Sequence, residues 1–203
     1  VGLGWDLPIP FIERKFADCT GNDVGSKCWA GENATISIDG MAATLVQTGA
    51  DADVTSFAMD GDQGYRIERV YGYGDNVNGD GVGFYWKVTD TAGTQFFFGR
   101  ENTAWQTTPN NSTLTMPVLH WNPGDPCYGG WNTCTMAWRW NLSYVVDANG
   151  NIQTYRYLKS VLTYEPWPGD YWDYDGEAVL ILIGYGRRTD TVKTGGPAQK
   201  IEF

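Results

Sequence analysis

A stretch near the middle of the chain, residues 138–157, constrains the fold most strongly. Apolar and polar residues alternate through it on both sides of Asn149-Gly150. This dipeptide is the strongest short-range signal for a β-hairpin, because both residues tolerate the positive φ that a type I′ turn requires. The sequence therefore predicts one long hairpin with Asn149 and Gly150 as its two loop residues.

This register places Tyr144 opposite Tyr155 and Leu142 opposite Tyr157, so that one face becomes an aromatic ladder. Cross-strand aromatic pairs contribute roughly 0.2–1 kcal/mol each, and a one-residue slip would move every side chain to the other face. The predicted aromatic spine consists of Trp138, Trp140, Tyr144, Tyr155 and Tyr157. The opposite face is polar, and we expect it to be solvated or to line a polar interior. Its residues are Arg139, Asn141, Ser143 and Arg156.

Composition extends this prediction to the whole chain. Aromatic residues make up 15% of the 203 residues, and 26 residues are glycine. Aromatic side chains favour strands and glycines favour turns, while no long segment has the apolar spacing of a helix. We expect an all-β, antiparallel, hairpin-rich fold with little or no helix, as a sheet or sandwich with open edges. No break in composition divides it, so residues 1–203 are predicted to form one unit.

The charge excludes two classes of partner. The net charge of −10 argues against binding to nucleic acid or to an anionic membrane surface, which both need clustered Lys and Arg. The longest purely apolar run, residues 178–183, is far shorter than the about 20 residues that a membrane span needs. We therefore predict no membrane span.

The four cysteines form two close pairs in sequence, Cys19 with Cys28 and Cys127 with Cys134. Neither pair has the C-x-x-C spacing of a zinc knuckle or a redox motif, so two local disulfides are the better interpretation. Disulfides indicate a secreted or cell-surface protein; four reduced thiols are the alternative. The sequence starts within a motif, so we expect a mature or excised piece of a longer product.

Residues 164–177 are the most function-like segment, and we expect an irregular loop there. Trp and Tyr rings beside carboxylates are typical of sugar-binding surfaces. The predicted glycan contacts are Trp167, Tyr171, Trp172, Asp173 and Tyr174. Two other interpretations stay open. The loop could pack its rings on a neighbouring sheet, or Glu165 and Glu177 could form a glycosidase pair, which needs a separation of roughly 5–10 Å.

Two further patterns indicate little chemistry. His120 is the only histidine and no nucleophile motif accompanies it, so a packing or surface role is expected. Residues 76–81 resemble the first half of a Ca²⁺ loop, but the twelfth position is Lys87 where a bidentate Glu belongs, which favours a plain turn. We predict no catalytic residue, no metal site and no cofactor.

Five pieces in order along the chain resemble one protein family. They are residues 1–7 with 11–14, 65–69, 84–90 with 93–99, 137–151, and 183–188 with 197–203. Together they are similar to the region that precedes the YD-repeat array in secreted bacterial RHS/YD-repeat proteins. The resemblance implies long strands that spiral into a hollow shell around a C-terminal toxin or effector. By this resemblance, residues 144–157 form a YD-like unit. The resemblance implies no catalytic residue for this region.

The resemblance leads us to expect a non-catalytic, toxin-associated wall segment, whose partners are the remainder of its own shell chain or further copies of itself. The YD-repeat array and the effector are not within the 203 residues. Two alternatives come from other classes of protein. One is a secreted carbohydrate-binding β-module, and the other is a self-assembling extracellular subunit.

Overall fold

The computed structural model describes residues 7–20, 25–61, 64–72, 83–101, 108–126, 128–129, 133–190 and 197–203, and these contain strands and no helix. All strand pairs are antiparallel except for a single parallel bridge between Leu119 and Cys28. The all-β, antiparallel prediction is therefore confirmed. The strands are β1 Phe11–Glu13, β2 Ala17–Asp18, β3 Lys27–Cys28, β4 Thr35–Ile38, β5 Met41–Ala50, β6 Val54–Met59, β7 Arg66–Tyr71, β8 Phe84–Thr89, β9 Gln95–Phe98, β10 Thr113–Leu119, β11 Thr133–Val146, β12 Asn151–Trp167, β13 Asp170–Arg188 and β14 Gln199–Glu202.

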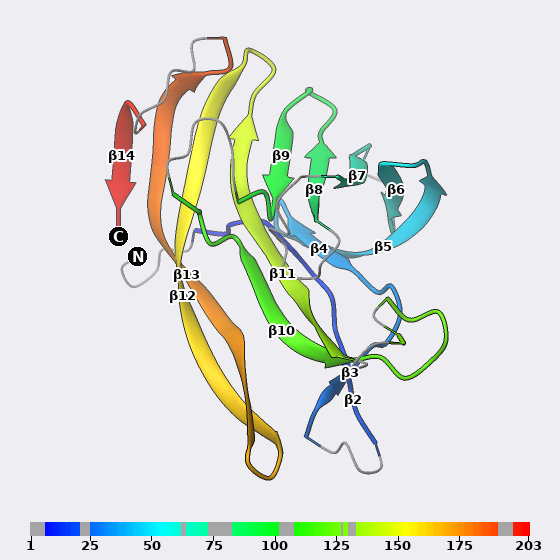
Figure 1. Ribbon diagram of the computed structural model, residues 1–203. Coiled ribbons are helices and arrows are strands. Elements are labelled where there is room, and N and C mark those ends of the chain that lie inside the picture. Colours follow the sequence, from blue (N-terminus) through cyan, green and yellow to red (C-terminus); the bar gives the residue numbers. More distant parts are fainter. Residues whose placement is uncertain are drawn as a thin grey trace.

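Eight strands close into a barrel in the order β1-β4-β5-β6-β7-β8-β9-β11 (Figure 1). The ring closes where β1 pairs with β11, with Ile12 opposite Trp140. Closure leaves these strands without free edges, in contrast to the open sheet or sandwich that the sequence suggested. The closing pair joins segments that are more than a hundred residues apart, and no local pattern reports such a contact.

The last three strands form an extension that we call the wing, consisting of β12, β13 and β14 (Figure 1). β12 and β13 are 17 and 19 residues long and form one hairpin, which turns at Pro168 and Gly169. The expected irregular loop at residues 164–177 is therefore wrong, because this segment is the strand-paired tip of the hairpin. Pro168 and Gly169, with φ of 86° at the glycine, suit a tight turn between two strands.

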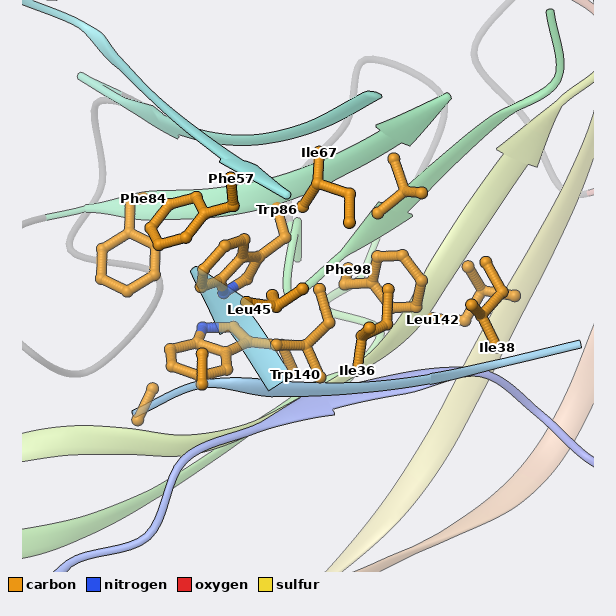
Figure 2. Close-up of a cluster of buried hydrophobic side chains, with 14 of the residues drawn as sticks. Ile36, Ile38, Leu45, Phe57, Ile67, Phe84, Trp86, Phe98, Trp140 and Leu142 are labelled. Carbon is orange, nitrogen blue, oxygen red and sulfur yellow. The ribbon is translucent and has the colours of Figure 1, made fainter. Parts of the chain in front are cut away.

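The core fills the barrel interior (Figure 2) and continues to β12 and β13, which contribute Tyr155, Tyr157 and Ile183. Trp86 and Trp140 lie edge to face with ring centroids 5.9 Å apart, and both are buried. Such pairs add about 0.5–1.5 kcal/mol beyond the area they bury. Aliphatic side chains from β4 and β7 pack around them, among them Ile36, Ile38 and Ile67. Strands far apart in sequence are thus held together by one aromatic centre.

The central hairpin forms, but with a different register. Its loop has three residues, 148–150, because Asp147 N–H donates to Asn151 O and Val146 pairs with Ile152. Gly150 has φ of 80° and Asn149 does not have a positive φ, so the loop is a type I turn followed by a left-handed glycine. Asp147 Oδ1 accepts the N–H groups of Asn149 and Asn151 at 2.8 Å each, which stabilises this turn over a type I′ turn.

The new register shifts the pairs by one residue. Tyr144 lies opposite Thr154 and not opposite Tyr155. A bulge in the pairing of β11 with β9 separates Leu142 from Tyr144, so the two side chains no longer share a face. Tyr144 stacks on Phe97, with centroids 4.3 Å apart, outside the core cluster that holds Leu142.

Candidate functional site

The structure separates the predicted aromatic spine into three environments. Trp140, Tyr155 and Tyr157 belong to the core cluster, and Tyr144 lies outside it. Trp138 is half-buried, and its Nε1 donates to the carbonyl oxygen of Asp175, 3.1 Å away. The spine is therefore not one continuous ladder, although all five side chains are at least half-buried.

The polar face of the central hairpin is mostly interior. Asn141 and Ser143 are buried, and the Ser143 hydroxyl donates to Ser112 Oγ at 2.9 Å. Arg139 is half-buried, with its guanidinium carbon 3.6 Å from the centroid of the Phe11 ring. Of the two expected environments, the polar interior is the one observed for these residues.

The wing has an exposed apolar face. Among the described residues, eight of the twelve exposed large apolar side chains lie on the wing or directly after it. Leu158 and Val179 pair across β12 and β13 and are 62% and 55% exposed. Leu162 follows four residues after Leu158 and therefore lies on the same face, where it is also exposed. We call this surface the outer face of the wing.

The wing also ends in an open edge. Among the strands that the structure describes, β14 pairs with β13 alone, and all four of its residues are exposed. Ile201 and the following Phe203 add apolar surface beside that edge. Exposed edge strands with apolar side chains readily pair with further strands, and natural proteins usually block or cover them.

Four aromatic rings pack on one another near the hairpin tip. Trp167 and Trp172 lie edge to face with centroids 5.2 Å apart, and Tyr164 contacts both Trp172 and Tyr174 in the same geometry at 6.0 and 5.8 Å. The Tyr164 hydroxyl is buried without a hydrogen-bond partner in the described structure, and this burial raises its pKa to about 12. We call these four residues the tip aromatics.

The five predicted glycan contacts do not come together on one face. Trp167, Trp172 and Tyr174 belong to the tip aromatics, whose rings pack against one another. Tyr171 and Asp173 alternate with them along β13 and therefore point to the other face. The Asp173 carboxylate also accepts a hydrogen bond from Thr163 Oγ1 at 2.6 Å.

A shallow pocket lies between the tip and the barrel side of the molecule. Its volume is about 400 Å³, and Tyr171, Trp172 and Asp173 line it opposite Pro117 and residues 133–135. Tyr171 is 67% exposed at this pocket. This pocket is the part of the predicted glycan surface that remains open.

The possible glycosidase pair is too widely spaced. Glu177 lies opposite Ser160, while Glu165 lies five residues further along β12. Five residues of extended strand span about 16 Å. The Glu165 carboxylate also accepts the N–H of Gly169 at 2.6 Å in the hairpin turn. A separation of this size does not fit the roughly 5–10 Å that either glycosidase geometry needs.

A polar cluster fastens the wing to β10. Asp175 Oδ2 accepts Thr115 N–H at 2.8 Å and Thr115 Oγ1 at 2.9 Å, and Lys159 Nζ lies 3.1 Å from the same oxygen. Lys159 also donates to Thr113 O at 2.9 Å, while Glu101 Oε1 accepts Thr113 N–H at 3.0 Å. Sequence analysis did not identify these residues, because they lie in unrelated stretches and none belongs to a recognisable motif.

The cystine region lies at the other end of β10. Cys19 and Cys28 form the expected disulfide, with Cα atoms 5.2 Å apart, and Cys134 is disulfide-bonded as well. Cys127, its expected partner, lies outside the described residues, as do residues 76–81 of the Ca²⁺-like motif. A pocket of about 360 Å³ lies beside the disulfide and is lined by Trp121 and Asn122, among other residues.

His120 has a packing role beside these cysteines. It is fully buried, stacks on Trp29 with centroids 5.8 Å apart, and has its Nε2 3.5 Å from Cys134 Sγ. Burial lowers the pKa of His120, and the nearby Arg14 acts in the same direction, while Asp125 opposes it. The imidazole is therefore neutral at neutral pH.

The described part of the chain contains neither a cluster of metal-ligating side chains nor a membrane-spanning helix. There, no group of three or more His, Cys, Asp or Glu side chains is placed to hold a metal ion. Nor do the described residues contain a helix long and apolar enough to cross a bilayer.

Comparisons with known proteins give one distant match. No protein-family model and no curated protein matches the chain. Among solved structures, the N-terminal domain of the effector protein SpvB from Salmonella typhimurium strain LT2 is similar, with 18% identity and a TM-score of 0.47. The match covers 90% of this chain and 53% of that chain, so this chain spans about half the length of that structure. A likeness at this level shows neither a shared family nor a shared activity.

Proposed function

We propose that this protein is a non-catalytic structural segment in the wall of an exported RHS-type shell, which encloses a toxin or effector. The observation that carries the proposal is the contrast between a closed barrel and an uncovered wing. Leu158, Leu162 and Val179 leave the outer face apolar and open to water, and within the described part of the chain no further strand pairs with β14. Further strands of a shell would cover both.

Other features support the same role. The Cys19–Cys28 disulfide suits an oxidising compartment, as secretion or cell-surface display requires. The wing extends the barrel sheet through β11 and β12, so additional strands could continue from β14 without rearranging the core. The resemblance to the region before the YD-repeat array implies such a continuation in the same chain.

The test is the intact mass of the naturally secreted product, measured before and after reduction and alkylation, with its terminal peptides identified. The proposal expects a product much larger than 22.5 kDa that forms hollow particles under the electron microscope. A natural product that ends near Val1 and Phe203 would contradict it. In that case, concentration-dependent oligomers in sedimentation would support the self-assembling subunit, and a strict monomer would exclude it.

The pocket at Tyr171 favours carbohydrate binding as a second candidate function. An exposed ring beside the Asp173 carboxylate suits a sugar, since C–H groups stack on the ring and hydroxyls donate to the carboxylate. Tyr171→Ala should remove glycan-dependent quenching of Trp fluorescence, whereas Tyr128→Ala, at another exposed tyrosine, should retain it. If none of a broad panel of polysaccharides quenches the wild-type fluorescence, this second function is wrong.

A further inference from the structure

We propose that Lys159 and Asp175 form an intramolecular isopeptide bond, with Glu101 as the proton carrier beside them. The proposal is independent of the shell function, because it concerns chemistry within the folded chain. It rests on how the fold brings one amine and two carboxyl groups together under β10.

A bulge sets the position of Asp175. Ser160 pairs with Glu177 and Val161 pairs with Asp175, so Gly176 is the extra residue on β13. A Cβ atom at Gly176 would lie 2.6 Å from Leu162 Cδ1, so a larger residue there would require the Leu162 side chain to move. The bulge places Asp175 diagonally across from Lys159 on the face of the hairpin that meets β10.

The reacting groups are in contact and partly shielded from water. Lys159 Nζ is 3.1 Å from Asp175 Oδ2, and the two side chains are 23% and 11% exposed. Two donors from Thr115 bind the same oxygen, and Trp138 Nε1 binds the Asp175 carbonyl. The side chains are therefore fixed in one arrangement, and fixed neighbours react far faster than free ones.

Glu101 lies beside this pair. Its carboxylate accepts Thr113 N–H, while Lys159 donates to the carbonyl of the same Thr113. Burial raises the pKa of Glu101, and Asp175 acts in the same direction, whereas the Thr113 N–H and Lys159 lower it. A carboxyl that holds its proton more readily than usual can pass that proton between the amine and the departing oxygen.

The reaction needs no other substrate. One proton passes from the Lys159 ammonium to the Asp175 carboxylate, which leaves a neutral amine facing a protonated carboxyl. Nζ then forms a bond to Cγ, and the Thr115 N–H and hydroxyl stabilise the oxygen of the tetrahedral intermediate. The C–O bond breaks, and the departing hydroxyl takes a second nitrogen proton, relayed by Glu101, and leaves as water. The product is an amide between β12 and β13.

The chain contains a matched control. Lys27 and Asp18 are also in contact on paired strands, but their side chains are 39% and 84% exposed. Because water reaches both side chains, they form an ordinary ion pair, and we expect no covalent bond between them.

The test is the intact mass of the full chain after denaturation, reduction and alkylation, followed by peptide mapping. The proposal expects a mass lower by one water molecule than the sequence requires, and a branched peptide that joins Lys159 to Asp175. Lys159→Met and Asp175→Ala should restore the full mass, whereas Lys27→Met should keep the deficit. Glu101→Gln, checked for folding by circular dichroism, should slow bond formation and change its pH profile. An intact mass with no deficit, and unlinked peptides for both residues, would overturn the proposal.

Discussion

The barrel and the wing use similar apolar residues but leave them in opposite environments. In the barrel, Trp86, Trp140 and Phe98 are buried in a closed ring. In the wing, Leu158 and Val179 pair on a face that remains exposed. The barrel therefore buries its apolar side chains within itself, whereas the wing leaves apolar side chains exposed to solvent. We therefore propose that the wing is the part of the molecule that contacts further strands or another partner.

The largest expected loss of stability distinguishes the barrel from the wing. Trp140→Ala should reduce the free energy of unfolding by about 3–5 kcal/mol, because it empties the barrel centre. Trp172→Ala removes edge-to-face contacts at the wing tip and should cost only about 1 kcal/mol. Chemical denaturation of both variants provides the measurement. Equal losses would mean that the tip is as integral to the core as the barrel.

A pair of glycines gives the next largest effect. Gly99 has φ of 69°, and a Cβ atom there would lie 2.2 Å from Trp140 Cδ1, while Gly169 has φ of 86° with open space around it. Gly99→Ala combines backbone strain with overpacking and should cost about 2–4 kcal/mol, against about 1 kcal/mol for Gly169→Ala. Thermal unfolding of both variants measures the contrast. A milder change at Gly99 than at Gly169 would be inconsistent with the rigid barrel.

The pH dependence of stability should have opposite signs at His120 and Glu101. The pKa of His120 is lowered from 6.5, so the unfolded chain takes up this proton first, and stability falls as pH drops below about 6.5. The pKa of Glu101 is raised from 4.5, so the unfolded chain loses its proton first, and stability falls as pH rises above about 4.5.

Each slope is at most about 1.4 kcal/mol per pH unit. Chemical denaturation from pH 4 to 7 measures the free energy of unfolding. His120→Gln should reduce its decrease toward acid pH, and Glu101→Gln should reduce its decrease toward higher pH. If neither variant changes the profile, burial does not control these two groups.

The smallest effect on stability concerns the outer face. Leu158→Lys should change the free energy of unfolding by no more than about 0.5 kcal/mol, because its side chain is exposed. The same variant should reduce self-association at high concentration, measured by light scattering, whereas Lys15→Gln, at an exposed barrel-side position, should not. A large loss of stability in Leu158→Lys would show that the outer face already packs against the molecule.

Local signals predicted the central hairpin but not its register. The residues around Asn149 and Gly150 indicate a turn, but Asp147 selects the three-residue loop by accepting two backbone N–H groups. The same arrangement recurs at Asp90, which accepts the N–H groups of Ala92 and Thr94. Both turns read Asp-x-x-Gly in sequence, and in both the aspartate stabilises the three-residue loop.

Contacts between residues far apart in sequence could not be predicted from local sequence patterns. Barrel closure depends on three residues of β1 meeting β11, and short strands carry little periodicity of their own. At residues 164–177, Pro166, Pro168 and Gly169 indicate a loop, yet cross-strand pairing with β13 overrides that local preference. Of the five predicted glycan contacts, Tyr171, Trp172 and Asp173 line the pocket, and their role in binding a sugar stays a prediction. The Lys159, Asp175 and Glu101 cluster depends on tertiary placement alone.

The most direct test of the central claim is hydrogen exchange of the wing in two forms of the protein, the isolated 203-residue chain and the natural secreted product. If the wing is a surface that further shell strands cover, the β14 amides exchange rapidly in the isolated chain and become strongly protected in the natural product. The barrel amides of β7 and β8 should be protected in both and serve as the internal standard. Equally rapid exchange of β14 in the two forms would contradict the account.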